Sequence, residues 1–367
     1  MVEDARVLPP RAGALRGARA LGVSAAAAAA ALVPLPPEIV ERWYSRGLYS
    51  RLQPAITSAS NALPVALIDV ALVAAAVWWL GAAAIDVQRR VRLGWVRIAG
   101  RLALRTIEAA AILYLAFLLL WGMNYRRVPL TAALQYDEAA VSPDAAVALA
   151  ATAVDRVNAL YDRAHAERDV GSAIAPALAA SFARLQRQIG LPYAARPGRP
   201  KQTIVDLYFR RAGVEGMTDP YFLETLVASD LLPIERPCTV AHEWAHLAGY
   251  ANEGEANFLG WLTAIGGGDV DQYSGWLFLT GELLRIVRAP DRAALVARLG
   301  PGPTADRRAI VDRVRRNISP RVSAVGWQVY DRYLRANRVE AGAASYAEVV
   351  RLALGVRFGP DWTPIVR

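Results

Sequence analysis

The spacing of apolar residues divides the chain into two unlike parts. Three long apolar runs lie in the first third of the chain, at 20–33, 62–85 and 102–123. The second and third runs are long enough to cross a hydrocarbon layer of about 30 Å. The first is mostly alanine, which contributes little transfer free energy, and is also compatible with a cleaved signal peptide. Because prolines follow it directly, we favour a retained helix. The pattern predicts a membrane anchor over residues 1–127, with transmembrane helices at about 18–36, 62–86 and 102–124.

Residues 128–367 are enough for one soluble domain with a core of its own. Apolar positions there recur mostly at helical spacing, and two short segments alternate as strands do. The fold class predicted is therefore mainly α: three N-terminal transmembrane helices, then a mostly helical, zincin-like α+β domain with a small sheet. The predicted helices cover about 143–167, 175–190, 234–248, 254–265, 272–288, 304–316, 320–337 and 346–356. The predicted strands are 203–209 and 221–227, and 191–200 is predicted to be a loop.

Arginine placement indicates the orientation in the membrane. Arginines precede the first apolar run and fill the loop between the second and third runs, at Arg6, Arg11, Arg16, Arg19, Arg89, Arg90, Arg92, Arg97 and Arg101. Arginine in short loops marks the cytoplasmic side, so three crossings place residues 128–367 outside the cytoplasm. The net charge of +9 is partly this signal. No basic stripe is interleaved with aromatic residues, so we expect a lipid bilayer but no nucleic acid as a partner.

The strongest chemical signal is the HExxH motif His242-Glu243-Trp244-Ala245-His246, which contains two of the three histidines in the chain. Histidines four apart lie on one helix face, so both imidazoles can bind one Zn²⁺ ion. Glu243 is then placed to act as a general base on water beside the metal. The third histidine, His165, ends a charged helical turn and is expected to face solvent. The only cysteine, Cys238, is expected to pack near the motif as a small buried residue.

Catalytic zinc usually has three protein ligands and one open position. Two glutamates follow the motif, Glu253 and Glu255. Asn252 has the features of a helix N-cap, with Glu255 as the reciprocal member of a capping box. That arrangement leaves Glu253 free to be the third ligand, and Asn257, one turn on, could orient a ligand. Glu255 remains the alternative ligand.

The chain resembles the bacterial domain-of-unknown-function 3810 family over nearly its whole length. The resemblance rests on segments 40–45, 121–126, 242–249, 253–258 and 273–275, and on Ser345-Tyr346 with Val349-Val350. It implies three N-terminal transmembrane helices followed by a zinc-metallopeptidase-like domain, in a multi-pass protein of the bacterial inner membrane. The chain has Trp244 and Ala248 where other members tend to have smaller aliphatic and polar residues, a difference that leaves the expected ligands unchanged.

These observations favour a membrane-anchored zinc metallopeptidase of the gluzincin type, with its catalytic domain on the periplasmic or extracellular side. His242, His246 and Glu253 are expected to bind zinc, and Glu243 is expected to act as the base. Tyr273, or less favourably Tyr346, would stabilise the oxyanion. The strand at 221–227 could pair with an extended peptide or protein substrate. The alternative is a non-catalytic scaffold or pseudopeptidase with a structural or vestigial metal site. Charged residues close to the motif disfavour an intramembrane protease.

Overall fold

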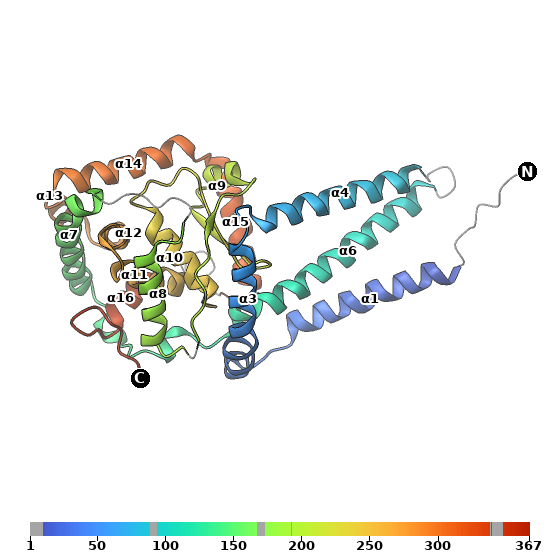
Figure 1. Cartoon of the computed structure of the whole chain (residues 1–367), viewed down its shortest axis with the longest axis horizontal. Helices are drawn as coiled ribbons and strands as arrows, with labels where there is room; N and C mark the ends of the chain where they lie inside the picture. The colour runs from blue at the N-terminus through green and yellow to red at the C-terminus, as the bar shows by residue number, and fades with distance from the viewer. Residues whose placement is uncertain (1–9, 89–93, 167–172, 192, 338, 340–347) are drawn as a thin grey trace, which may run out of the picture. The chain divides into compact units, whose positions relative to one another are not determined.

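In the computed structural model, the described residues are 10–88, 94–166, 173–191, 193–337, 339 and 348–367. Their contacts divide the chain into two compact units. Unit 1 is Met1–Leu35 with Val70–Leu120, and unit 2 is Pro36–Asp69 with Trp121–Arg367. The protein is mainly helical with one three-stranded sheet, which confirms the predicted fold class at this coarser level (Figure 1).

Unit 1 contains the apolar helices. α4 (Leu67–Gln88, which begins in unit 2) and α6 (Trp95–Leu120) are each long and apolar enough to cross a membrane. α1 (Pro10–Leu32) passes that test only when its residues 17–32 are joined to Pro37–Asn61 across a bend of 110°. The described residues therefore contain two candidate spans, or three if the bent pair is one span. Arg6, Arg11 and Arg16, and the loop arginines Arg89, Arg90 and Arg92, lie outside the residues whose side chains are described.

Polar side chains in unit 1 pair with one another across neighbouring helices. Arg19 of α1 donates from Nε to Oε1 of Glu108 on α6, at 2.6 Å. Asp86 of α4 is fully buried and accepts from Nη1 of Arg105 on α6, at 2.5 Å. Ion pairing of this kind is the usual means of keeping charged groups in apolar helices.

Unit 2 begins with α2 (Pro37–Ile39), the π-helical segment η1 (Val40–Leu48) and α3 (Tyr49–Asn61). The sequence analysis placed this segment in the membrane anchor, but its contacts belong to unit 2. Gln53 Nε2 donates to the carbonyl of Arg196 at 2.8 Å, and Thr57 Oγ1 donates to that of Leu223 at 2.9 Å. Tyr49, Gln53, Thr57 and Ser60 are buried at helical spacing. A face of this kind binds polar backbone rather than lipid.

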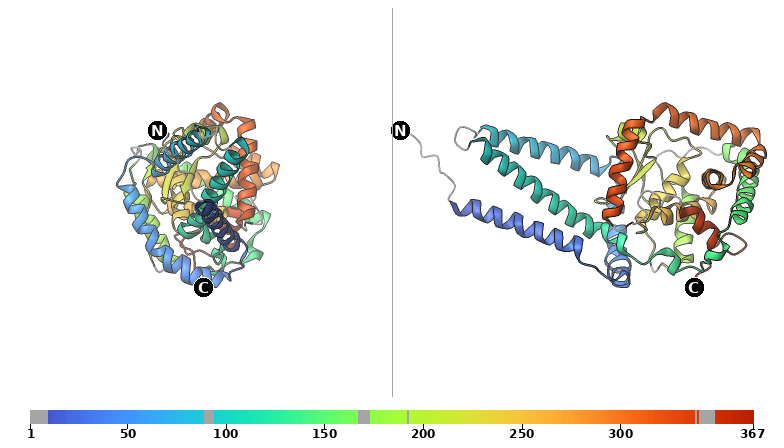
Figure 2. Two further views of the ribbon diagram at one scale, coloured as in Figure 1. Left: turned by 90° about the vertical axis from the view of Figure 1, so that its right-hand side faces the viewer. Right: turned by 180° about the vertical axis from the view of Figure 1, so that it is seen from behind.

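The remaining helices agree with the predicted ones to within a few residues. They are α7 (Pro143–Ala166), α8 (Pro176–Gln188), α10 (Arg236–Leu247), α11 (Glu253–Ile265), α12 (Asp269–Ile286), α14 (Pro301–Asn317), α15 (Pro320–Ala336) and α16 (Glu348–Gly355). α13 (Ala289–Ala297) was not predicted, and short 3₁₀ turns occupy Gly122–Arg126, Leu130–Ala132 and Glu138–Ala140. α10, α11 and α12 lie inside unit 2, whereas α7, α14 and α15 lie at its periphery (Figures 1 and 2). Trp244, Trp261 and Tyr273 are fully buried there.

The sheet corrects two predictions. It consists of β1 (Pro200–Lys201), β2 (Gly216–Asp219) and β3 (Glu224–Val227) in the order β1-β3-β2, with β3 parallel to β1 and antiparallel to β2. The strand predicted at 203–209 is wrong, because most of that segment forms α9 (Asp206–Ala212). The alternation of apolar and polar residues in this segment is too short to distinguish a strand from a helix. Asp206 lies in the first turn of α9, where acidic side chains are favourable.

The predicted edge pairing at 221–227 is also wrong. β3 is the central strand, so both of its edges are already paired, and β2 is the strand at the edge.

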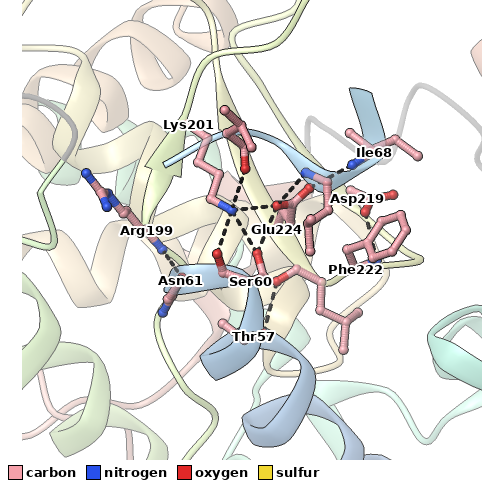
Figure 3. Close-up of polar contacts among 12 residues, drawn as sticks. Thr57, Ser60, Asn61, Ile68, Arg199, Lys201, Asp219, Phe222 and Glu224 are labelled. Atoms are coloured by element: carbon pink, nitrogen blue, oxygen red, sulfur yellow. Dashed lines mark hydrogen bonds and ion pairs between the residues drawn. The ribbon is translucent and has the colours of Figure 1, made fainter. Parts of the chain in front are cut away.

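A buried ion pair joins the sheet to the start of α4 (Figure 3). Nζ of Lys201, the only lysine in the chain, lies 2.6 Å from Oε1 of Glu224. The two oxygens of Glu224 also accept from the backbone N–H groups of Leu67 and Ile68, at 3.0 and 3.1 Å. A carboxylate at a helix N-terminus satisfies donors that have no partner within the helix. Ser60 donates a further hydrogen bond to Glu224 at 2.9 Å.

Candidate metal centre

α10 positions the two histidines of the motif. Its N-terminal turn contains Pro237, which needs no hydrogen-bond acceptor there. Trp244, on the buried side of the helix, donates from Nε1 to the carbonyl of Gly198 at 2.8 Å. The helix ends at Leu247, and Gly249 adopts a φ of 86°, a conformation that favours glycine. His242 and His246 therefore project from one short, firmly packed helix.

α11 brings the third candidate ligand to the same place. Asn252 caps the helix, because its side chain accepts from the backbone N–H of Glu255 at 3.0 Å. Further along α11, Gly260 passes so close to α10 that an added Cβ atom would lie 2.8 Å from Cα of His242. This close approach holds the first turn of α11, with Glu253, beside the histidines.

The structure brings together His242, His246 and Glu253, whose ligand atoms all lie within 4.8 Å of one another. Oε2 of Glu253 is 3.3 Å from Nε2 of His242 and 3.4 Å from Nε2 of His246. The two Nε2 atoms are 3.1 Å apart. Among the described residues, Oε2 of Glu253 is a buried oxygen without a hydrogen-bond partner. A carboxylate oxygen and two imidazole nitrogens turned toward one point form a donor set that suits Zn²⁺.

Neighbouring groups fix the orientation of these ligands. Nδ1 of His246 lies 2.7 Å from the carbonyl of Tyr250, which directs Nε2 toward Glu253. Tyr330 of α15 donates a hydrogen bond from its hydroxyl to Oε1 of Glu253, the oxygen that does not face the histidines. Hydrogen bonds of this kind set the tautomer and ring orientation of metal-binding histidines and hold ligating carboxylates.

The charges in this cluster stabilise one another. Burial disfavours the charged form of His246, but Glu253 outweighs this effect and the pKa of His246 rises to about 9. Burial likewise acts to raise the pKa of Glu253, yet the two imidazoles hold that pKa well below its usual value. Glu253 is therefore an anion at neutral pH, the form that binds a cation.

Glu243 lies on the sheet side of α10 and is almost completely buried. Its Oε2 atom is 2.8 Å from Oγ1 of Thr218 on β2, which also lies 2.9 Å from the backbone carbonyl of Glu243. Gly216, two residues earlier on the same face of β2, leaves space for the carboxylate: an added Cβ atom would lie 2.7 Å from Oε1. Burial raises the pKa of Glu243, which makes the group a stronger proton acceptor.

Glu255, the alternative ligand, faces a different part of the unit. One of its carboxylate oxygens accepts from the backbone N–H of Leu130 at 2.5 Å, and burial raises its pKa to about 7. Only half of the expected capping box forms, because this contact with Leu130 takes the carboxylate that would have returned to Asn252. Asn257 is buried one turn after Glu253, and its role in orienting a ligand stays a prediction.

The structure does not group Tyr273 with the three candidate ligands. Its hydroxyl donates to Oδ2 of Asp306 at 2.5 Å, and its ring packs against Tyr161 and His165. His165 is exposed and lies 3.2 Å from the same Asp306 oxygen. The other proposed oxyanion donor, Tyr346, lies outside the described residues.

Tyr330 and Thr218 were missed by the sequence analysis. Tyr330 lies 77 residues after Glu253, and Thr218 lies 25 residues before Glu243. Neither residue belongs to a motif, and only the packing of α15 and β2 brings them to the site. Gly216 and Thr218 of β2 both face Glu243, but this pattern can be recognised in the sequence only after the strand has been located.

The chain belongs to the family described as Protein of unknown function (DUF3810), which matches residues 44–354. That range includes all three candidate metal ligands and Glu243. No curated protein and no solved structure matches the chain.

Proposed function

We propose that the protein is a membrane-anchored, zinc-dependent hydrolase that cleaves amide bonds of a peptide or protein substrate. The observation that carries this proposal is the convergence of His242, His246 and Glu253, beside a separately held carboxylate, Glu243. Two imidazoles and one carboxylate on adjacent helices would hold Zn²⁺ with a coordination position left for other ligands. Zinc in such a site acidifies water and polarises a carbonyl group.

Glu243 performs the proton transfers in this proposal. It accepts a proton from the attacking water as the oxygen adds to the carbonyl carbon. It then returns the proton to the amine nitrogen as the C–N bond breaks. The hydroxyl of Thr218 keeps the carboxylate turned toward β2. Because this contact fixes one oxygen, the other is left to exchange the proton.

The sheet suggests how a substrate could be aligned. β2 is the edge strand next to α10, and Thr218 on that strand contacts Glu243. An extended peptide that adds to the outer edge of β2 would form main-chain hydrogen bonds close to the base. A hydrolase with this arrangement would select substrates by backbone shape, with side chains contributing secondary preferences.

A non-catalytic scaffold with a structural metal is the second candidate. Structural zinc sites are normally closed by four protein ligands. Among the described residues, the candidate group has three, and Cys238 is buried on α10 with a pKa raised by that burial. A thiol of this kind resists the deprotonation that metal binding requires. The ligand count therefore favours catalysis.

We also propose that the protein is anchored in the bacterial inner membrane and that unit 2 lies outside the cytoplasm. Unit 2 is discontinuous, since Pro36–Asp69 and Trp121–Arg367 fold together. If both parts lie on one side, the chain between them crosses the membrane an even number of times, and α4 and α6 are long and apolar enough to be those two crossings. A reporter that works only outside the cytoplasm, fused after Arg127, should be active. Activity of a cytoplasmic reporter at that position would show that the orientation is the reverse of the proposed one.

The decisive experiment compares the full-length protein with its Glu243→Gln variant. Both should contain one zinc per chain, because Glu243 is not a ligand in this proposal. Hydrolysis of a peptide library should fall by about 10²–10⁴-fold in the variant, the usual contribution of a general base. His242→Ala provides the control that loses both zinc and activity. If Glu243→Gln fully rescues a deletion strain, the scaffold alternative is correct. If the wild-type protein binds no zinc, both candidates are wrong.

A further inference from the structure

Exposed apolar side chains gather around the first turn of α4. Leu63 and Val65 lie in the connection that leads into this helix. Ile204, which is 64% exposed, and Leu207 lie just before and within α9. Isolated exposed apolar residues are ordinary on a protein surface, but a contiguous group indicates an interaction site.

Hydrogen bonds within unit 2 hold these segments together. Asp69, the last residue of unit 2 before the apolar run of α4, accepts from the backbone N–H of Ile204 at 2.9 Å. It also accepts from Oγ1 of Thr203 at 2.6 Å. Nζ of Lys201 donates to the carbonyl of Val65 at 3.1 Å. The exposed side chains at both places are thus fixed beside the residue from which α4 continues.

α15 extends the same surface. It packs against α9 closely enough that a Cβ atom added to Gly326 would lie 3.1 Å from the hydroxyl of Tyr208, and the two helices lie side by side in Figure 1. Val325 and Val329, one turn apart on α15, are 61% and 60% exposed. Arg321 and Arg332 are exposed on the same helix. We call Leu63, Val65, Ile204, Leu207, Val325 and Val329 the apolar collar.

We propose that the apolar collar rests in the lipid headgroup region of the membrane that α4 crosses. A helix that enters a bilayer carries its first turn to the membrane surface, so the side chains fixed beside Asp69 reach the same depth. Apolar side chains next to exposed arginines are typical of interfacial helices, where apolar groups enter the acyl boundary and arginines meet phosphates. The proposal depends on α4 crossing the membrane and does not depend on hydrolysis.

The collar would also link the lipid surface to the metal centre. Val325 and Val329 lie on the outer face of α15, while Tyr330, on its inner face, contacts Glu253. A helix has a diameter of about 10 Å with its side chains. The candidate ligands would therefore lie close to the membrane surface, where a cleavable segment next to a transmembrane helix could reach them.

The test uses the full-length protein in vesicles of phosphatidylcholine and phosphatidylglycerol. Single cysteines introduced by Ile204→Cys, Val325→Cys or Val329→Cys are labelled with a polarity-sensitive fluorophore, with the native Cys238 buried and protected. Val296→Cys on α13 is the matched control: it is 40% exposed and lies at the far end of unit 2 from α9 and α15 (Figure 1). Val77→Cys, in α4, reports separately whether that helix is in the bilayer.

The emission of fluorophores on the apolar collar should shift to shorter wavelengths, and lipids that carry a quencher near the headgroup should reduce their fluorescence. The fluorophore of the Val296→Cys variant should be quenched only by iodide in the aqueous phase. If the Val77→Cys label is quenched by lipid while the collar labels respond like the control, α4 crosses and the proposal is wrong. Shielding of the collar in native membranes but not in these vesicles would indicate a protein partner and would equally overturn it. Failure of hydrolysis would leave these readouts unchanged.

Discussion

The hydroxyl of Tyr330 donates a hydrogen bond to Oε1 of Glu253, leaving Oε2 directed at the two motif histidines. A carboxylate held in this way cannot rotate freely, so its ligand oxygen is already oriented before a metal arrives. The contact joins α15, near the C-terminal end of the chain, to the first turn of α11.

Removing this hydroxyl should weaken the metal site without unfolding the protein. In Tyr330→Phe we expect zinc affinity to fall about 10–100-fold, the usual effect of losing a group that orients a metal ligand. Competition with a fluorescent chelator measures this change. Tyr333→Phe is the control, since its hydroxyl on the same helix lies 3.5 Å from that of Tyr125. Equal zinc affinity in all three proteins would remove Tyr330 from the site.

The two glutamates of α11 should behave differently when each is replaced by alanine. Glu253→Ala should lose stoichiometric zinc, because two protein ligands rarely retain it against a chelator. Glu255→Ala should keep zinc but unfold at a lower temperature, because it leaves the N–H of Leu130 without its acceptor. Zinc content per chain and the melting temperature separate the two effects. The reverse pattern would make Glu255 the ligand.

Gly216 offers a test of the base that leaves every proposed ligand intact. In Gly216→Ala the new methyl group would lie 2.7 Å from Oε1 of Glu243, so the carboxylate must move. We expect zinc binding to persist while hydrolysis falls by at least about 10-fold, part of the contribution of a general base. Gly281→Ala is the matched control, because nothing lies within 4 Å of its added Cβ. Unchanged turnover in Gly216→Ala would argue against Glu243 as the base.

Asp219 should make the stability of unit 2 depend on pH. Burial raises its pKa from the ordinary 3.8 to about 6, so the folded state favours the protonated acid. The stabilisation that Asp219 adds to the free energy of unfolding is present in full below pH 3.8. It is lost as the pH rises through 6, by a total on the order of 3 kcal/mol. Melting temperatures of the wild-type protein and Asp219→Asn, compared from pH 4 to pH 7, test this expectation. The variant should show the shallower decline, and parallel curves would contradict the assignment.

The sequence predicts the parts of the site that depend on local spacing. Histidines four apart define the candidate metal-binding face of α10, and the cap at Asn252 separates Glu253 from Glu255 within a single turn. Most helices of unit 2 were also predictable, because their apolar residues recur at helical spacing and several of them, such as α8 and α10, have proline in the first turn.

Long-range contacts explain what the sequence analysis missed. Residues 49–61 lie between two apolar runs and were assigned to the membrane anchor, although their buried polar face hydrogen-bonds to groups more than 130 residues later in the chain. The segment 203–209 alternates like a strand and still forms α9. Such short segments take the structure that their neighbours impose, and no local pattern records those neighbours.

The contacts of Glu224 with the first turn of α4 constrain how the protein can be made and divided. The acceptor for Leu67 and Ile68 is synthesised more than 150 residues after them. In the proposed topology, α4 therefore enters the bilayer before the carboxylate that completes its N-terminus has been synthesised. A fragment that starts at residue 128 would contain Lys201 and Glu224 but lack Ser60, Leu67 and the whole of α3. Such a fragment would expose buried charge where the native chain has a helix, so the protein should be produced and purified with residues 1–127 attached.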